Sequence, residues 1–185
     1  MQPYDAILDF APCRIGVHFI GEALTQLDYL PPTTPLTRDP DQRAKHLANE
    51  LSHYTQHPEH VFDLLFIPQG TPFQLRIWHA LLAIPAGRPV SYGALAIQLN
   101  TAPRAIGQAC GANPLPLVIP CHRVIAANGL GGFMHAASGA PLDIKAWLLR
   151  HERGELDSGV ISSSAPSPQP SPACGRGCKS NAHTD

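Results

Sequence analysis

The chain has 185 residues, of which 44% are hydrophobic, so it can hold one large domain or two small ones. No run of about 18 apolar residues could span a membrane, and the N-terminus lacks the basic and then apolar pattern of a signal peptide. Five irregularly spaced cysteines do not indicate a disulfide framework, so we expect a cytoplasmic protein without membrane contact.

The net charge of −1 conceals an uneven distribution. Residues 1–63 carry four Lys/Arg and nine Asp/Glu, whereas residues 64–153 carry seven and two. This division favours a negatively charged partner that is bound by the basic segment alone. The phosphates of DNA would be attracted to such a basic surface. Chance clustering of solvated charges explains the split equally well, so it does not identify the partner alone.

The first 68 residues are expected to form a small α/β domain. Apolar-rich runs predict strands at 6–10, 15–20, 24–30 and 62–66, and residues 24–30 alternate between apolar and polar. Apolar residues at helical spacing predict a helix over 39–54, with Asp39 as its N-cap and Pro40 in its first position.

Residues 69–153 are expected to form a second, mostly helical domain. Helices are predicted at 73–83, 92–99, 103–111 and 142–153. The first three should begin after the N-caps Thr71, Ser91 and Thr101. The very short turn between the second and third is typical of a helix-turn-helix. An apolar strand should then lead to Cys121.

Beyond residue 153 the composition shifts to Ser, Pro and Gly. Residues 154–185 cannot bury enough apolar surface to offset the entropy of ordering, so we expect a disordered tail. Cys174 and Cys178 could be half of a metal knuckle, but no second Cys/His pair is nearby in the sequence.

The most informative segment is Asn113–Ile125, in which an apolar run delivers Cys121 beside His122 and Arg123. Thiolate is the nucleophilic form of cysteine, and imidazole or cationic neighbours lower the thiol pKa. Most cysteines in apolar surroundings are nevertheless inert structural thiols. The dipeptide alone therefore leaves both interpretations open.

The whole segment NPLPLVIPCHRVI resembles the active-site segment of the O6-alkylguanine-DNA alkyltransferases, which move an alkyl group from damaged guanine onto their own cysteine. The stretches VSYG (90–93), APRAIG (102–107) and WLLRHE (147–152) match further motifs of that family. The resemblance covers about residues 71–153. It implies a winged-helix-like C-terminal domain after a small N-terminal α/β domain of ribonuclease-H-like shape.

The resemblance implies a role for each matched residue of the reactive centre. Cys121 would be the nucleophile, His122 would act on it through a water, and Glu152 would orient that histidine. A carboxylate at a helix C-terminus opposes the helix dipole, which favours a functional Glu152 over an ordinary exposed acid. Asn113 would brace the active-site turn, and Tyr92 would protonate the departing guanine.

The resemblance also implies a DNA-binding surface. Arg104 would fill the gap left by an extruded base, and Ala102 and Gly107 belong to a helix with so little side-chain bulk that it could enter the minor groove. Arg123 and Ser138 are further expected DNA or substrate contacts. Tight helix–helix packing is the alternative explanation of the small residues.

The implied function is the irreversible transfer of a methyl or other alkyl group from O6-methylguanine in duplex DNA to Cys121, once per molecule. We expect a monomer that needs no cofactor. No metal is expected either, because Cys13 and His18 lack the further ligands of the structural zinc that some members hold. The loop at 131–141 departs from the family pattern and leaves the preference among alkyl groups open.

Two other functions are compatible with parts of the sequence. An alkyltransferase-like protein that only recognises damage would lack a cysteine at this position, so Cys121 counts against it. A Cys–His hydrolase would need an oxyanion hole and a substrate cleft, and the sequence indicates neither.

Overall fold

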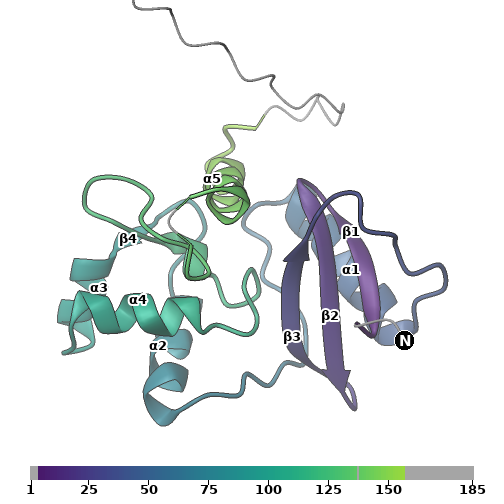
Figure 1. The fold of residues 1–185 in the computed structure, drawn as a ribbon, viewed down its shortest axis with the longest axis horizontal. Helices are drawn as coiled ribbons and strands as arrows, with labels where there is room; N and C mark the ends of the chain where they lie inside the picture. Colours follow the sequence, from purple (N-terminus) through teal and green to yellow (C-terminus); the bar gives the residue numbers. More distant parts are fainter. Residues whose placement is uncertain (1–3, 137, 157–185) are drawn as a thin grey trace, which may run out of the picture.

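The structure, a computed structural model, describes residues 4–136 and 138–156. The tail expected at 154–185 lies almost wholly outside the described residues. Within the described residues the chain is an α/β protein with five α-helices and a small antiparallel sheet (Figure 1). This confirms the α/β part of the predicted fold class.

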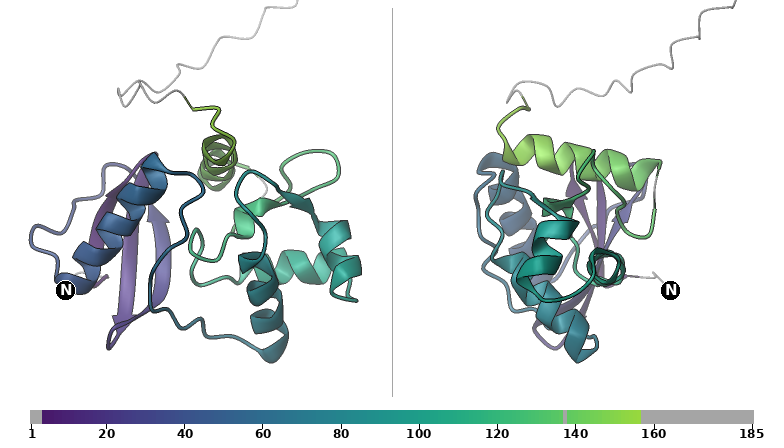
Figure 2. Two further views of the ribbon diagram at one scale, coloured as in Figure 1. Left: turned by 180° about the vertical axis from the view of Figure 1, so that it is seen from behind. Right: turned by 90° about the vertical axis from the view of Figure 1, so that its left-hand side faces the viewer.

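Three strands form the N-terminal sheet in the order β1-β2-β3. They are β1 (Ala6–Phe10), β2 (Cys13–Ile20) and β3 (Ala23–Leu30). Alternation along β2 buries Ile15 and Val17 completely. Helix α1 (Gln42–Gln56) covers one face of this sheet and contributes Leu47 and Leu51 to the same core (Figure 2).

The start of α1 differs from the prediction. The Oδ1 atom of Asp41 accepts a hydrogen bond from Ala44 N at 3.0 Å, so Asp41 rather than Asp39 is the N-cap. The carboxylate of Asp39 instead lies 3.4 Å from Lys45 Nζ. Two aspartates flank one proline in this sequence, and the local pattern does not distinguish which of them reaches a free backbone N–H.

The strand predicted at 62–66 was also wrong. This segment meets the sheet only where Phe66 bridges Leu24 in parallel. The backbone N of Leu24 donates to Leu65 O at 2.9 Å, and Ile67 N donates to Leu24 O at 3.0 Å. Its alternating burial is therefore that of an extended segment without a continuous ladder.

The C-terminal half consists of short elements around the predicted cysteine. These are α2 (Pro72–Leu82), β4 (Val90–Ser91), α3 (Tyr92–Gln98), α4 (Pro103–Gly111), the 3₁₀ turn η1 (Cys121–Arg123), β5 (Val124–Ile125) and α5 (Ala140–Glu152). Thr71 and Ser91 cap α2 and α3 as predicted. Ala102, not Thr101, is the N-cap of α4, and it makes no side-chain cap because its methyl group cannot accept a hydrogen bond.

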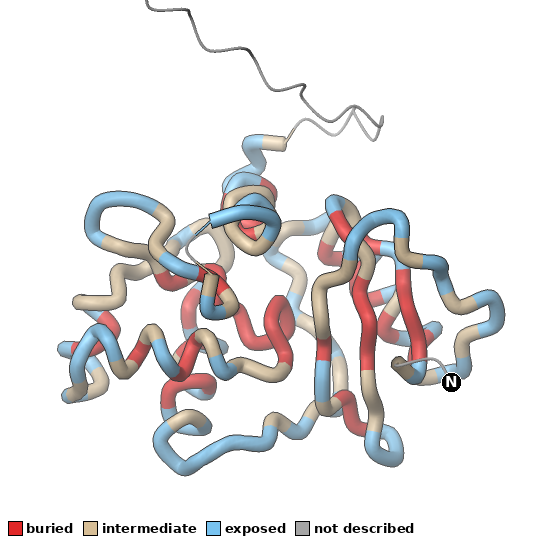
Figure 3. The backbone as a smooth tube through the Cα atoms, in the orientation of Figure 1, coloured by how far each residue is buried: buried red, intermediate tan, exposed pale blue. Residues whose placement is uncertain are grey.

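The two halves share one hydrophobic core, although the sequence predicts two domains with a boundary after residue 68. Phe10 contacts Trp147 edge to face at 5.7 Å between ring centroids, and Leu27 N donates to Pro114 O at 2.9 Å. Figure 3 shows buried segments in both halves, their side chains belong to one hydrophobic cluster, and α5 contacts both halves through Trp147 and Glu152. None of the described helices combines the length and apolar character needed to cross a membrane.

Candidate active site

The segment before Cys121 is a braced loop and not the predicted strand. The Asn113 side chain spans it, because its Oδ1 accepts from Leu115 N at 3.0 Å and its Nδ2 donates to Ile119 O at 2.8 Å. Leu117 has a φ of 78°, in the left-handed region, which bends the chain between these two bonds. The geometry agrees with the bracing role that the resemblance implies for Asn113.

The 3₁₀ turn of η1 places Cys121 and His122 together in the interior. Cys121 is 2% exposed and His122 is 0% exposed. The Nε2 atom of His122 lies 2.8 Å from Glu152 Oε1. Its Nδ1 atom is buried and has no hydrogen-bond partner among the described residues. A buried ring nitrogen of this kind needs a partner, so a water there is the simplest expectation.

Glu152 is the centre of a buried hydrogen-bond network. Besides His122, it accepts bonds from Arg123 Nη2 at 2.8 Å, from the Tyr54 hydroxyl at 3.0 Å and from Gly87 N at 3.2 Å. Burial alone would raise the pKa of Glu152, but the contacts with His122 and Arg123 outweigh burial and lower it to about 2. Glu152 is therefore a carboxylate at neutral pH that can only accept hydrogen bonds, so Nε2 of His122 carries the hydrogen and donates it to Oε1.

Arg123 lies in this network and not on the outer surface. Its side chain is 13% exposed, its Nε and Nη2 contact both carboxylate oxygens of Glu152, and its Nη1 donates to Ile84 O at 2.6 Å. These contacts occupy the guanidinium, in contrast to the expected DNA contact. Arg123 instead holds Glu152 in position.

The Cys121 thiol is neutral at rest. Burial raises its pKa to about 11, although the Asn113 amide and the Lys145 charge act in the opposite direction. Burial lowers the pKa of His122, despite the opposing effect of Glu152, so its imidazole is neutral at pH 7. A protonated thiol thus adjoins a neutral imidazole, which can serve as a general base.

Lys145 on α5 is a site residue that the sequence analysis missed. It is fully buried, and its Nζ donates to the carbonyl oxygens of Val124 at 2.7 Å, Leu130 at 2.7 Å and Gly132 at 3.0 Å. Burial lowers its pKa to about 8. Position 145 lies on the same helix face as Leu148 and Glu152. A lysine on this buried face could have been recognised from the sequence as a residue that needs polar partners in the interior.

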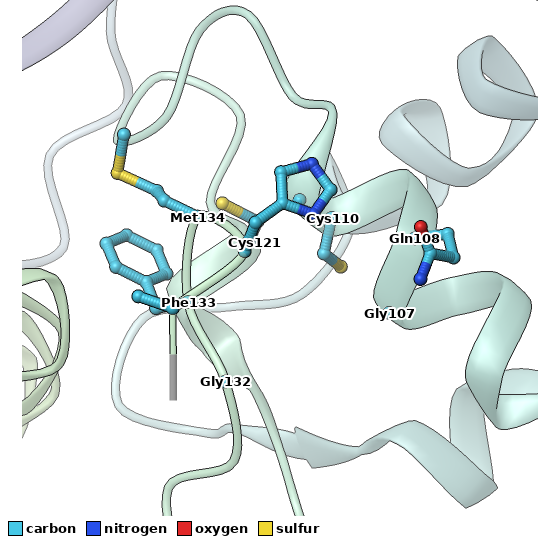
Figure 4. Close-up of a pocket in the computed structure, with 10 residues that line it drawn as sticks. Gly107, Gln108, Cys110, Cys121, Gly132, Phe133 and Met134 are labelled. Carbon is cyan, nitrogen blue, oxygen red and sulfur yellow. The ribbon is translucent and has the colours of Figure 1, made fainter. Parts of the chain in front are cut away.

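A cavity of about 290 Å³ opens beside Cys121. One wall is α4, with Gly107, Gln108, Cys110 and Gly111, and the other is the loop Gly132–Ala136. Figure 4 shows Cys121 between Phe133 and Met134 of the loop and Cys110 of the helix. The cavity therefore gives a substrate access to the Cys121 sulfur.

The loop wall is held by the hydroxyl of Tyr92, which donates to Gly132 O at 3.1 Å. Burial raises the pKa of Tyr92, so this hydroxyl keeps its proton. Tyr92 thus lies next to the cavity wall as a proton donor.

The remaining predicted residues are spread over the outer face. Ala102 is exposed just before α4 and Arg104 is exposed on it, whereas Gly107 of the same helix lines the cavity. Ser138 is exposed before α5 and does not line the cavity. The structure therefore places Cys121, His122 and Glu152 together in the interior, whereas the residues expected to contact DNA do not all lie together.

The fold and the site define an α/β protein in which a buried Cys–His–Glu group faces a cavity beneath a helix of small residues. Residues 72–154 match the family model described as "6-O-methylguanine DNA methyltransferase, DNA binding domain". The chain is 44% identical over 115 residues to a methylated-DNA–protein-cysteine methyltransferase of Methanosarcina mazei, which covers 60% of this chain and 70% of the relative.

A protein of the same name from Salmonella typhimurium is 48% identical over 110 residues, which span 57% of this chain and 61% of the relative. Among solved structures, Mycobacterium tuberculosis OGT in complex with DNA aligns with a TM-score of 0.64 and 31% identity, over 82% of this chain and 95% of that one. The chain belongs to the methylated-DNA–protein-cysteine methyltransferase family and shares its enzyme class.

Proposed function

We propose that the protein removes the methyl or another alkyl group from O6 of guanine in duplex DNA and transfers it to Sγ of Cys121. The observation that carries this proposal is the placement of Cys121 at the cavity with His122 and Glu152 buried behind it. The names of the family and of its relatives support the same substrate.

The proton path follows from the hydrogen bonds of His122. Because Nε2 donates to the Glu152 carboxylate, Nδ1 is the free acceptor and takes the thiol proton through a water. The sulfur then attacks the alkyl carbon, an S–C bond forms and the bond from carbon to guanine O6 breaks. Glu152 stabilises the imidazolium that results.

The leaving guanine needs a proton to depart as a neutral base. Tyr92 is suited to supply it, because its hydroxyl is protonated and bonded to Gly132 on the cavity wall. The thioether product is stable toward the groups present, so each molecule reacts once. This chemistry uses only side chains of one chain, and we infer a monomer that needs no cofactor.

DNA would be bound by α4 after extrusion of the damaged nucleotide into the cavity. Helices α3 and α4 would act as the helix-turn-helix of a winged-helix-like domain at 69–153, after a ribonuclease-H-like domain at 1–68. The exposed start of α4 presents Ala102 as its N-cap and Arg104 in its first turn, so the helix backbone can approach the minor groove while Arg104 fills the vacated position. Exposed Arg76 and Arg88 add positive charge to this half.

The test is the mass of the intact protein after incubation with a duplex that contains O6-methylguanine, followed by peptide mapping. We expect one methyl group in place of one hydrogen on the Cys121 peptide, in stoichiometric amount. Cys121→Ala should bind the duplex and gain no mass. Tight binding by the natural chain without a mass change would instead identify a damage-recognition protein.

A further inference from the structure

Histidines concentrate at the end of α1, on the N-terminal half. Four of the ten histidines of the chain lie within residues 46–60. Glu50 and His53 are three residues apart on α1 and therefore share one helix face. The loop after α1 returns His60 to this face, where its Nε2 lies 2.9 Å from Glu50 Oε2.

We propose that Glu50, His53 and His60 bind a divalent transition-metal ion, with Zn²⁺ the best match. One possible ligand atom from each of the three lies within 4.8 Å of the other two. Two imidazole nitrogens and one carboxylate oxygen are a common zinc donor set, with a water as the fourth ligand. The earlier expectation of no metal considered only Cys13, His18 and the tail cysteines.

The surrounding structure already orients two of the three ligands. The Glu50 side chain is 8% exposed, and its Oε2 also accepts from Asp63 N at 2.6 Å. The His60 ring packs edge to face on Phe62 at 5.7 Å between centroids. A buried carboxylate is costly without a cationic partner, so the position favours a cation.

The third ligand can complete the site with little rearrangement. His53 is exposed, and its ring centroid lies 5.4 Å from that of His60 at an interplanar angle of 79°. Rotation about its side-chain bonds is therefore not opposed by packing. Metal binding would replace the hydrogen bond between Glu50 and His60 with a metal–ligand bond to each side chain.

Titration of the metal-free full-length chain with Co²⁺, followed by visible absorption, tests the proposal. We expect one equivalent to give the d–d bands of a tetrahedral site with nitrogen and oxygen ligands, and Zn²⁺ to displace it. His53→Ala should weaken binding about tenfold or more, because it removes a ligand from an exposed position without disturbing the core.

His79→Ala is the matched control, because His79 is an exposed histidine on α2 in the other half. This variant should bind Co²⁺ like the natural chain. Glu50→Gln, which keeps the side-chain shape, should also lose the d–d bands. The proposal is overturned if the natural chain gives no such bands, if its spectrum shows only thiolate ligands, or if His53→Ala binds equally well.

Discussion

The reactivity of Cys121 depends on the residues that take up its proton. With a thiol pKa raised to about 11, less than about one molecule in a thousand is a thiolate at pH 7. The neutral imidazole of His122, oriented by an ionised Glu152, offers an alternative to a preformed thiolate. A preformed thiolate and a thiol deprotonated by His122 predict different dependences of the alkyl-transfer rate on pH.

The rate of alkyl transfer should level off with pH in the natural chain. His122 has a lowered pKa, so it is already neutral at about pH 7, and raising the pH to about 9 should change the single-turnover rate little. Below the lowered pKa of His122 the rate should fall as the imidazole is protonated. His122→Gln should be about 100-fold slower at pH 7 and should gain rate steadily with pH. A natural chain whose rate rises tenfold per pH unit would show that a preformed thiolate reacts.

At the scale of elements, α5 and α1 hold the site from two sides. Lys145 of α5 joins three carbonyl groups of β5 and the following loop, and Glu152 ends the same helix. Tyr54 of α1 reaches across the junction, since its hydroxyl donates to Glu152 and its carbonyl lies 2.8 Å from His151 Nε2. The acidic N-terminal half thereby contributes to the reactive centre.

Lys145→Met should destabilise the protein by roughly 2–4 kcal/mol, because it leaves several buried carbonyl groups without a donor. Urea denaturation monitored by circular dichroism measures this change. Lys45→Met, which alters a half-exposed lysine on α1, is the control and should change the free energy of unfolding little. Equal effects of the two substitutions would contradict a structural role for Lys145.

Tyr54→Phe should slow alkyl transfer about fivefold, the equivalent of roughly 1 kcal/mol for one lost hydrogen bond to Glu152. The ring keeps its packing against Phe62, so folding should be preserved. The comparison is Tyr4→Phe on the sheet, beside His18, which should react at the natural rate. If Tyr54 positions Glu152, the pH dependence of the alkyl-transfer rate should also shift in Tyr54→Phe. An unchanged pH profile would exclude this positioning role.

At the scale of the whole molecule, the two halves depend on one another. The core is continuous between them, and a hydrogen bond from Leu27 N to Pro114 O joins β3 to the loop before Cys121. Of the basic residues in the C-terminal half, Arg123 and Lys145 are used internally. The positive surface available to DNA is therefore smaller than the residue count of the sequence indicates.

The shared core predicts a single unfolding transition. Circular dichroism, which follows the sheet and helices together, and fluorescence of Trp78 and Trp147 should give the same denaturation midpoint. Two separated midpoints would show that the halves unfold independently. In that case the contacts of Tyr54 and Leu27 across the junction would contribute little to stability.

The sequence by itself determined the local features of this protein: most element positions, the caps Thr71 and Ser91, and the segment that carries Cys121. Such features depend on neighbours along the chain, whose spacing is visible in the sequence. The tertiary structure decided the turn at Cys121, the inward side chain of Arg123, the buried Lys145 and the contact of Tyr54 with Glu152. The contacts of Arg123, Lys145 and Tyr54 depend on which buried polar groups meet across 13 to 98 residues of sequence, because each must find a partner once water is excluded.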